Sequence, residues 1–257
     1  MRFNSFFPTV FACLLQWDAS QAIVGGEAQD TANPYLVSVV SSGWFGDSHI
    51  CGGVIIGSKT VLTAAHCVDG SSASSLKVQY GGTDRTKLKI KTPLTKVTMH
   101  PSWSASTSDN DFAILRLYTA VTGEDGNPMT TYGQLATSSP ATGSETNISG
   151  WGKKHGSDDQ LSTQLQGVAL EALEASTCEA KWSDVNHITS NMACAESGSG
   201  SFCVGDDGGP VTDATGSKIY GILSWGENGC PADTTVRPNV YADVTSASAS
   251  EFIRLNT

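Results

Sequence analysis

Short apolar runs recur along the chain, and a cluster of turn-forming residues separates each run from the next. Runs of this length, rich in Val, Ile and Leu and bounded by Gly, Ser, Thr and Asp, predict an all-β sandwich or barrel. Regular amphipathic helices do not alternate with the runs, which argues against a doubly wound α/β sheet. Residues 248–255 predict a short amphipathic helix near the end. The runs are Leu36–Val40, Val54–Ile56, Leu76–Tyr80, Phe112–Leu117, Val168–Leu170, Ile219–Trp225 and Val240–Val244.

The N-terminal residues 1–22 have the composition of a secretory signal peptide. Arg2 gives a positive start, residues 6–17 are largely apolar, and small residues stand where a signal peptidase would cut. The alternative, a buried N-terminal helix, is disfavoured by Pro8. We therefore expect a secreted, extracellular protein with one folded domain over residues 23–257. No later run reaches about 18 apolar residues, so no membrane-spanning helix is expected.

Seven cysteines are present, which is an odd number for a secreted chain. Removal of the signal peptide discards Cys13 and leaves six, and an even set in an oxidising compartment predicts disulfides. A metal site is the alternative, but the sequence lacks the CxxC pairs that such sites use. We expect no metal and no cofactor. The six cysteines are Cys51, Cys67, Cys178, Cys194, Cys203 and Cys230.

The charge balance restricts the class of partner. Lys and Arg together number 15 and Asp and Glu together number 25, which gives a formal net charge of −10. A pI near 4.8 argues against a nucleic-acid partner, which needs a basic face, and equally against docking on an acidic membrane surface. We expect a monomer whose unidentified partner is a protein or a glycan.

Four short strings occur in a fixed order, and together they are far more specific than any one of them alone. They are Ile23-Val24-Gly25-Gly26, then Thr63-Ala64-Ala65-His66-Cys67, then Asp109-Asn110-Asp111-Phe112-Ala113-Ile114-Leu115, then Gly205-Asp206-Asp207-Gly208-Gly209-Pro210. This set resembles the trypsin/chymotrypsin family of serine peptidases, and the resemblance covers residues 23–257. It implies an all-β fold of two antiparallel six-stranded β-barrels with a short C-terminal helix. The active site of that fold lies in the cleft between the barrels.

The resemblance implies a catalytic pair and a disulfide pattern. His66 is implied as the general base and Asp111 as the carboxylate that orients it. The physical reason is that a neutral imidazole accepts a proton at one nitrogen only if the other nitrogen is held by a buried acceptor. The implied disulfides are Cys51–Cys67, Cys178–Cys194 and Cys203–Cys230.

The glycine-rich string implies two further functional elements. Its glycines allow a tight turn, and the backbone N–H groups of Gly205 and Asp207 are implied to form an oxyanion hole. Asp206 is expected to pair with the α-ammonium of Ile23 once the signal peptide is cut, because a buried charge needs a partner.

Asp207 stands where the family has its serine nucleophile, and this departure decides the predicted function. A carboxylate that attacks a peptide bond has to expel an amine and leave a mixed anhydride, which lies uphill. Its permanent negative charge can also occupy the oxyanion hole or pair with His66. An imidazole between two carboxylates favours the protonated form and no longer acts as a base. The sequence therefore predicts a proteolytically inactive homologue.

A second departure concerns the pocket that would receive a substrate side chain. By the resemblance Ser201 lies at its base, and Phe202 and Asn239 stand where small residues are usual. We therefore expect these two side chains to fill the pocket. The alternative is a pocket tuned to very small side chains. The strand implied along the pocket consists of Ser224, Trp225 and Gly226.

Three functions remain open at this stage. Asp207 favours a secreted, inactive homologue that binds a protein or glycan. The rest of the motif set favours an active serine endopeptidase. The third function is a different hydrolase that uses Asp207 as nucleophile or metal ligand. Separately, Asn147 begins an Asn-Ile-Ser sequence and is a candidate glycosylation site.

Overall fold

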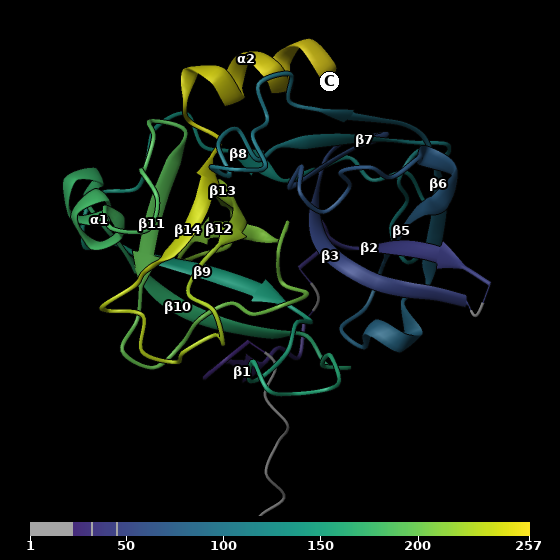
Figure 1. The fold of residues 1–257 in the computed structure, drawn as a ribbon. Coiled ribbons are helices and arrows are strands. Elements are labelled where there is room, and N and C mark those ends of the chain that lie inside the picture. Colours follow the sequence, from purple (N-terminus) through teal and green to yellow (C-terminus); the bar gives the residue numbers. More distant parts are fainter. Residues whose placement is uncertain (1–22, 32, 45) are drawn as a thin grey trace, which may run out of the picture.

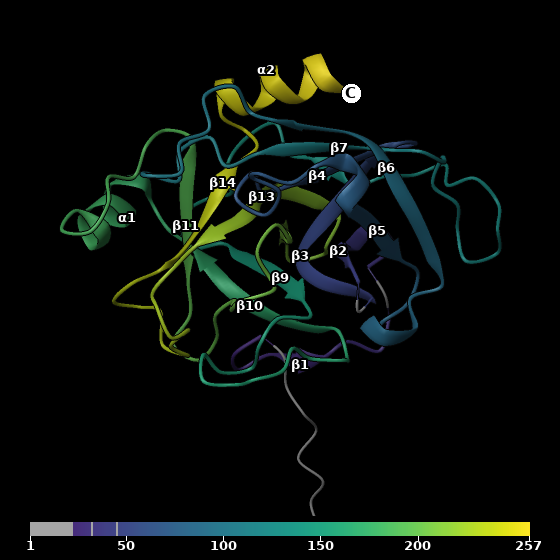
Figure 2. The ribbon, with the colours of Figure 1, turned by 45° about the vertical axis from the view of Figure 1, so that its right-hand side comes forward.

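A computed structural model of the chain describes residues 23–31, 33–44 and 46–257. The predicted signal peptide, with Cys13, lies outside the described residues. Figures 1 and 2 show two β-barrels side by side, with the C-terminal helix across the top of the view.

The first barrel closes six antiparallel strands in the order β2-β3-β4-β7-β6-β5. Buried and partly buried residues alternate along Leu76–Tyr80, because successive side chains of a strand point to opposite faces of the sheet. The strands are β2 (Leu36–Gly43), β3 (Gly46–Gly57), β4 (Thr60–Thr63), β5 (Leu76–Tyr80), β6 (Ile90–Met99) and β7 (Ala113–Leu117).

The second barrel closes in the order β9-β10-β11-β14-β13-β12, because β9 pairs with both β10 and β12. Two short strands, β1 (Glu27–Ala28) and β8 (Gln134–Leu135), extend this sheet, and β8 pairs in parallel with β13. The barrel strands are β9 (Glu145–Gly150), β10 (Gln166–Ala172), β11 (Met192–Glu196), β12 (Pro210–Asp213), β13 (Lys218–Trp225) and β14 (Asn239–Asp243). The two six-stranded barrels confirm the expected fold class.

Four short helices in the described part of the chain connect or cover the barrels. They are the 3₁₀ helices η1 (Ala73–Ser75) and η2 (Arg85–Lys87), and the α-helices α1 (Ala175–Trp182) and α2 (Ala247–Asn256). The Ser246 side chain caps α2 by accepting a hydrogen bond from the Ala249 amide. Within the described residues, no helix combines the length and apolar character that crossing a membrane requires.

An apolar cluster joins the two barrels to each other and to α2. Phe112, at the start of the run into β7, is fully buried and packs with Ile222 of β13 and Phe252 of α2. Truncation of such a phenylalanine to alanine typically costs about 3–5 kcal/mol. This shared core holds the residues before β7 in a fixed place relative to the second barrel, which positions Asp111.

Three disulfides connect segments within the described residues, in the pairing that the resemblance implied. Cys51–Cys67 and Cys178–Cys194 each span 16 residues, and Cys203–Cys230 spans 27. Each closed loop stabilises the fold by about 2–4 kcal/mol, because it restricts the unfolded chain. Two of them, Cys51–Cys67 and Cys203–Cys230, flank the strings that carry the site residues.

Candidate active site

His66 and Asp111 meet between the barrels. His66 follows β4 and Asp111 precedes β7, and β4 and β7 are paired neighbours. The His66 Nδ1–H donates to Asp111 Oδ2 over 2.7 Å, and the His66 amide donates to Asp111 Oδ1 over 2.9 Å. The Asp111 side chain is fully buried, whereas the His66 side chain is 33% exposed. This geometry fixes Nδ1 and leaves Nε2 facing Asp207, whose Oδ1 lies 3.8 Å away.

Ser224 completes the surroundings of Asp111, a role that the motif alone did not reveal. Its Oγ–H donates to Asp111 Oδ2 over 2.6 Å, from the end of β13. The same carboxylate therefore accepts hydrogen bonds from both barrels, which locks its orientation.

The Asp207 side chain occupies the space beside both His66 and the Gly205 amide. One oxygen, Oδ2, accepts a hydrogen bond from the Gly205 N–H over 3.3 Å, and Oδ1 lies 3.8 Å from His66 Nε2. Gly205 and Gly208 have positive φ angles of 97° and 77°, a conformation that glycine adopts without strain. The carboxylate thus engages one amide of the predicted oxyanion hole.

The charges of this group favour a protonated imidazole. Burial opposes the charged form of His66, but the hydrogen bond and charge of Asp111 and the charge of Asp207 outweigh it and raise the pKa of His66. Burial also raises the pKa of Asp207, and the neighbouring His66 charge and Gly205 amide offset part of this rise. His66 therefore lies between two carboxylates, as the sequence indicated.

The loop that carries Asp207 is attached to the first barrel through its backbone. The Gly52 amide of β3 donates to the Asp207 carbonyl oxygen over 2.7 Å. A Cβ added at Gly52 would lie 2.8 Å from the Cα of Gly209, and one added at Gly208 would lie 2.4 Å from Thr63 Oγ1. Glycine is required at these positions because the two barrels approach so closely here.

Asp206 is fully buried and is held by backbone amides. The amides of Gly152 and Cys203 donate to its oxygens over 2.7 and 3.0 Å. Burial raises the pKa of Asp206 to about 7, although these two hydrogen bonds act in the opposite direction. The expected partner Ile23 is also fully buried, but in the 257-residue chain its nitrogen belongs to a peptide bond. The ion pair is therefore not formed in this state of the chain.

The pocket beside the site is open, contrary to the expectation that Phe202 and Asn239 fill it. A cavity of about 230 Å³ is lined by Ser201, Phe202, Ser224, Trp225, Gly226 and Asn239, among others. The Asn239 amide donates to the Ala195 carbonyl oxygen over 3.3 Å and to Thr234 Oγ1 over 3.4 Å. The Phe202 ring lies against Gly226, where an added Cβ would be 3.3 Å from it. Both residues line the cavity, and its volume of about 230 Å³ shows that they do not close it.

A buried histidine, His49, is hydrogen-bonded to the glycine-rich loop that carries Asp207, and the sequence motifs did not identify it. His49 Nε2–H donates to the Gly205 carbonyl oxygen over 2.7 Å, and its Nδ1 accepts from Ser38 Oγ over the same distance. Burial lowers the pKa of His49 to about 4, so the ring is neutral at physiological pH. His49 stands outside the recognised strings, and only its position before Cys51-Gly52-Gly53 could have drawn attention to it.

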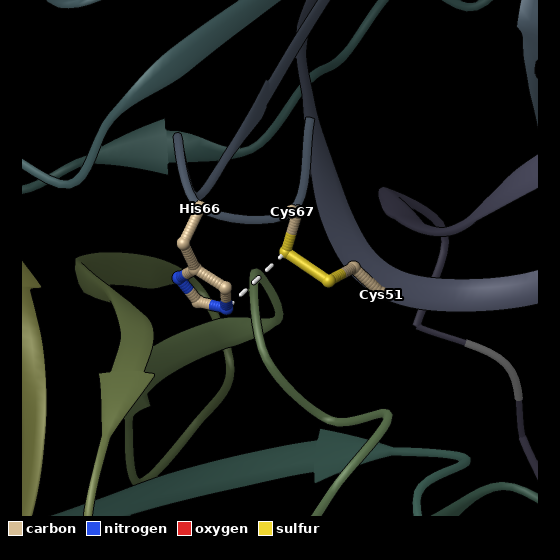
Figure 3. A group of neighbouring side chains, drawn as sticks. All are labelled: Cys51, His66 and Cys67. Atoms are coloured by element: carbon tan, nitrogen blue, oxygen red, sulfur yellow. Dashed lines mark hydrogen bonds between the residues drawn. A yellow bond between two sulfur atoms is a disulfide. The ribbon is translucent and has the colours of Figure 1, made fainter. Parts of the chain in front are cut away.

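Figure 3 shows a cysteine–histidine group beside this site: Cys51, His66 and Cys67. Both sulfur atoms are bonded to each other in the disulfide, and Cys67 Sγ lies 3.7 Å from His66 Nε2. A disulfide has no thiolate to offer a metal ion, so these three residues do not form a metal site. Asp109 is the other carboxylate of the Asp109-Asn110-Asp111 string that could be considered as a metal ligand. Its Oδ1 instead accepts hydrogen bonds from Thr189 and Asn191.

Asn147, the candidate glycosylation site, lies in the middle of β9. Its Nδ2 donates to the Ala214 carbonyl oxygen over 3.1 Å, and the residue is partly exposed. Modification stays a prediction for this residue.

Known proteins are similar to this chain in sequence over most of its length. The family model described as Trypsin matches residues 22–250. Trypsin alpha of Drosophila erecta is 33% identical over 224 residues, which is 86% of this chain and 83% of the relative. Trypsin delta of Drosophila melanogaster is 34% identical over 226 residues (87% and 85%), and Trypsin Blo t 3 of Blomia tropicalis is 34% identical over 224 (86% and 80%). A family match of this length, with a third of positions shared over most of both chains, means that this chain belongs to the trypsin family.

Proposed function

We propose that the protein is a secreted, proteolytically inactive member of the trypsin family that binds a partner protein through its cleft. The position of the Asp207 side chain carries this proposal, since it engages the Gly205 amide and lies 3.8 Å from His66 Nε2. By the family resemblance, this is the place of the serine nucleophile. The adjoining residues of the string, Gly205, Asp206, Gly208 and Gly209, have no hydroxyl group to replace it.

Three parts of the serine-peptidase reaction are weakened together. The serine nucleophile is absent, and Asp207 does not replace it, because carboxylate attack on an amide gives an unfavourable mixed anhydride. The base is compromised, since neighbouring carboxylates raise the pKa of His66. One oxyanion-hole donor already bonds Asp207, and a fixed negative charge there opposes the charge of a tetrahedral intermediate. Loss of one triad member alone leaves only about 10³–10⁴-fold catalysis over water.

The cleft keeps the means to bind a peptide side chain. Two buried polar atoms, Ser201 Oγ and Trp225 Nε1, have no hydrogen-bond partner among the described residues, and both residues line the 230 Å³ cavity. An unpaired buried polar group costs about 1–3 kcal/mol, so a ligand whose entry shifts these side chains and pairs them would recover part of that free energy. We infer that a small, neutral, polar side chain on a partner protein enters this pocket.

Secretion is supported by the disulfides and by the predicted signal peptide. Three disulfides in one domain are typical of oxidising compartments outside the cytosol. Cleavage at residue 22 would also free the Ile23 amine, which is the partner that buried Asp206 requires for charge.

An active peptidase is the second candidate, and the intact His66–Asp111–Ser224 arrangement favours it. The relatives that carry the name trypsin favour it as well. The two candidates differ in one measurable property, the presence of a nucleophile that attacks an electrophilic probe.

The deciding experiment treats the purified mature form with a fluorophosphonate probe. We expect no labelling of the native protein, labelling of Asp207→Ser, and none of the double variant Asp207→Ser with His66→Ala. Circular dichroism of each variant checks that it is folded. Labelling of the native protein, or its turnover of a peptide panel, contradicts the proposal.

A further inference from the structure

A second hollow, separate from the cleft, lies on the outer face of the first barrel. It has a volume of about 730 Å³ and lies over β2, β3, β5 and the segment that leads into β6. In Figure 1, β2 and β3 run together to the hairpin at the right edge of the molecule. The side chains that give the hollow its character are Trp44, Asp47, Lys77, Arg85, Leu88 and Lys91.

The hollow is positively charged on an acidic protein. Its lining holds three cations, Lys77, Arg85 and Lys91, against the single carboxylate of Asp47, for a net charge of +2. The surrounding stretch, residues 77–96, contains six of the 15 basic residues of the chain and only one acidic residue. On a chain whose net charge is −10, this local excess of positive charge favours an anionic ligand at this face.

Asp47 lies between two of these cations and sets the spacing of the positive charge. Lys91 Nζ donates to its Oδ2 over 2.5 Å and Lys77 Nζ to its Oδ1 over 3.1 Å. The hydrogen bond from Lys91 holds the pKa of Asp47 well below its usual value, so the carboxylate stays ionised. The Lys77 and Lys91 side chains remain 33% and 49% exposed, which leaves N–H groups free for a ligand.

Trp44 gives the hollow an apolar edge. Its side chain is fully exposed at the end of the hairpin, and Leu88 lines the other part of the hollow. An exposed tryptophan next to basic residues is the composition of a binding hot spot, because aromatic anchors and Arg dominate interface energies.

We propose that this hollow binds an acidic peptide segment of a partner protein, one that carries apolar side chains between its carboxylates. The lysines and Arg85 would pair with the carboxylates, and Trp44 and Leu88 would pack on the apolar groups. A sulfated glycan fits less well, because Asp47 repels a dense row of negative charges and a glycan offers little for Trp44 and Leu88 to bury. The proposal extends beyond the cleft and does not depend on whether Asp207 abolishes proteolysis.

Fluorescence anisotropy of a labelled, blocked peptide of Glu-Glu-Leu-Gly repeats tests the proposal with the intact mature protein. We expect saturable binding that weakens with added salt, because screening reduces exposed ion pairs. The same peptide with Gln in place of Glu should not bind. Lys91→Gln should weaken the native interaction about fivefold, and Trp44→Ala about tenfold.

Matched controls separate this surface from general charge and hydrophobicity. Lys218→Gln removes an exposed lysine on β13, and Tyr118→Ala removes an exposed aromatic side chain, and neither residue lines the hollow. Both should bind the peptide as the native protein does. Equal affinity for the Glu and Gln peptides, unchanged affinity in Lys91→Gln and Trp44→Ala, or binding of heparin without binding of the acidic peptide would each overturn the proposal.

Discussion

Asp207→Asn should lower the pKa of His66, because it removes one of the two negative charges that stabilise the imidazolium. The relevant separation is 3.8 Å between Asp207 Oδ1 and His66 Nε2. Asparagine keeps the shape of the side chain, so the change tests charge rather than packing.

The size of the effect follows from that distance. Two unit charges 3.8 Å apart interact by about 1 kcal/mol in water and about 4 kcal/mol at an effective dielectric constant of 20. The side chains are 33% and 22% exposed, so solvent screening favours the lower end of this range. Since 1.36 kcal/mol corresponds to one pKa unit, we expect the pKa of His66 to fall by about one.

An NMR titration of the His66 ring protons measures this directly in the native protein and the variant. Glu251→Gln, which removes an exposed carboxylate from α2, serves as the control and should leave the titration unchanged. An unaltered His66 pKa in Asp207→Asn would refute the view that Asp207 holds His66 protonated, and would weaken the argument for inactivity.

Three further perturbations test the surroundings of the site. Burial raises the pKa of Asp206 to about 7, above its value in the unfolded chain, so the stability that its proton contributes is full below about pH 4 and is lost as the pH rises through 7. In denaturant titrations of the uncut chain, Asp206→Asn should flatten the resulting slope of about 1.4 kcal/mol per pH unit in the free energy of unfolding. A slope in the variant equal to the native one would contradict this. Gly152→Ala should lower the free energy of unfolding by about 1–3 kcal/mol, because the added Cβ would lie 2.4 Å from an Asp206 oxygen; a thermal midpoint equal to the native one would contradict this. Replacement of Cys203 and Cys230 by serine should cost about 3.5 kcal/mol by chemical denaturation, since the disulfide spans 27 residues, and a loss below about 1 kcal/mol would contradict the estimate.

The features that could be predicted from the sequence are those with a local signature. The runs of β-type residues predict strands. The helix predicted over residues 248–255 is present as α2, which is one residue longer at each end. His66 and Asp111 were brought together by their strings, because each string fixes the backbone around one site residue.

The features that could not be predicted depend on contacts between distant segments. The Ser38–His49–Gly205 chain of hydrogen bonds joins β2, β3 and the glycine-rich loop, and none of these residues signals the others. Asn239 was expected to fill the pocket on grounds of size. Its direction is instead set by a hydrogen bond to Ala195 on the neighbouring strand, which residue size does not disclose.

The hydrogen bond from Gly52 to the Asp207 carbonyl has a consequence for how such proteins arise. It uses the backbone of residue 207 and not its side chain, so it forms with aspartate as it would with serine. The shape of the loop therefore depends on the docking of the two barrels and not on the side chain at residue 207. Exchange of that one side chain would leave the architecture in place, so the proposed loss of proteolysis requires no change elsewhere in the fold.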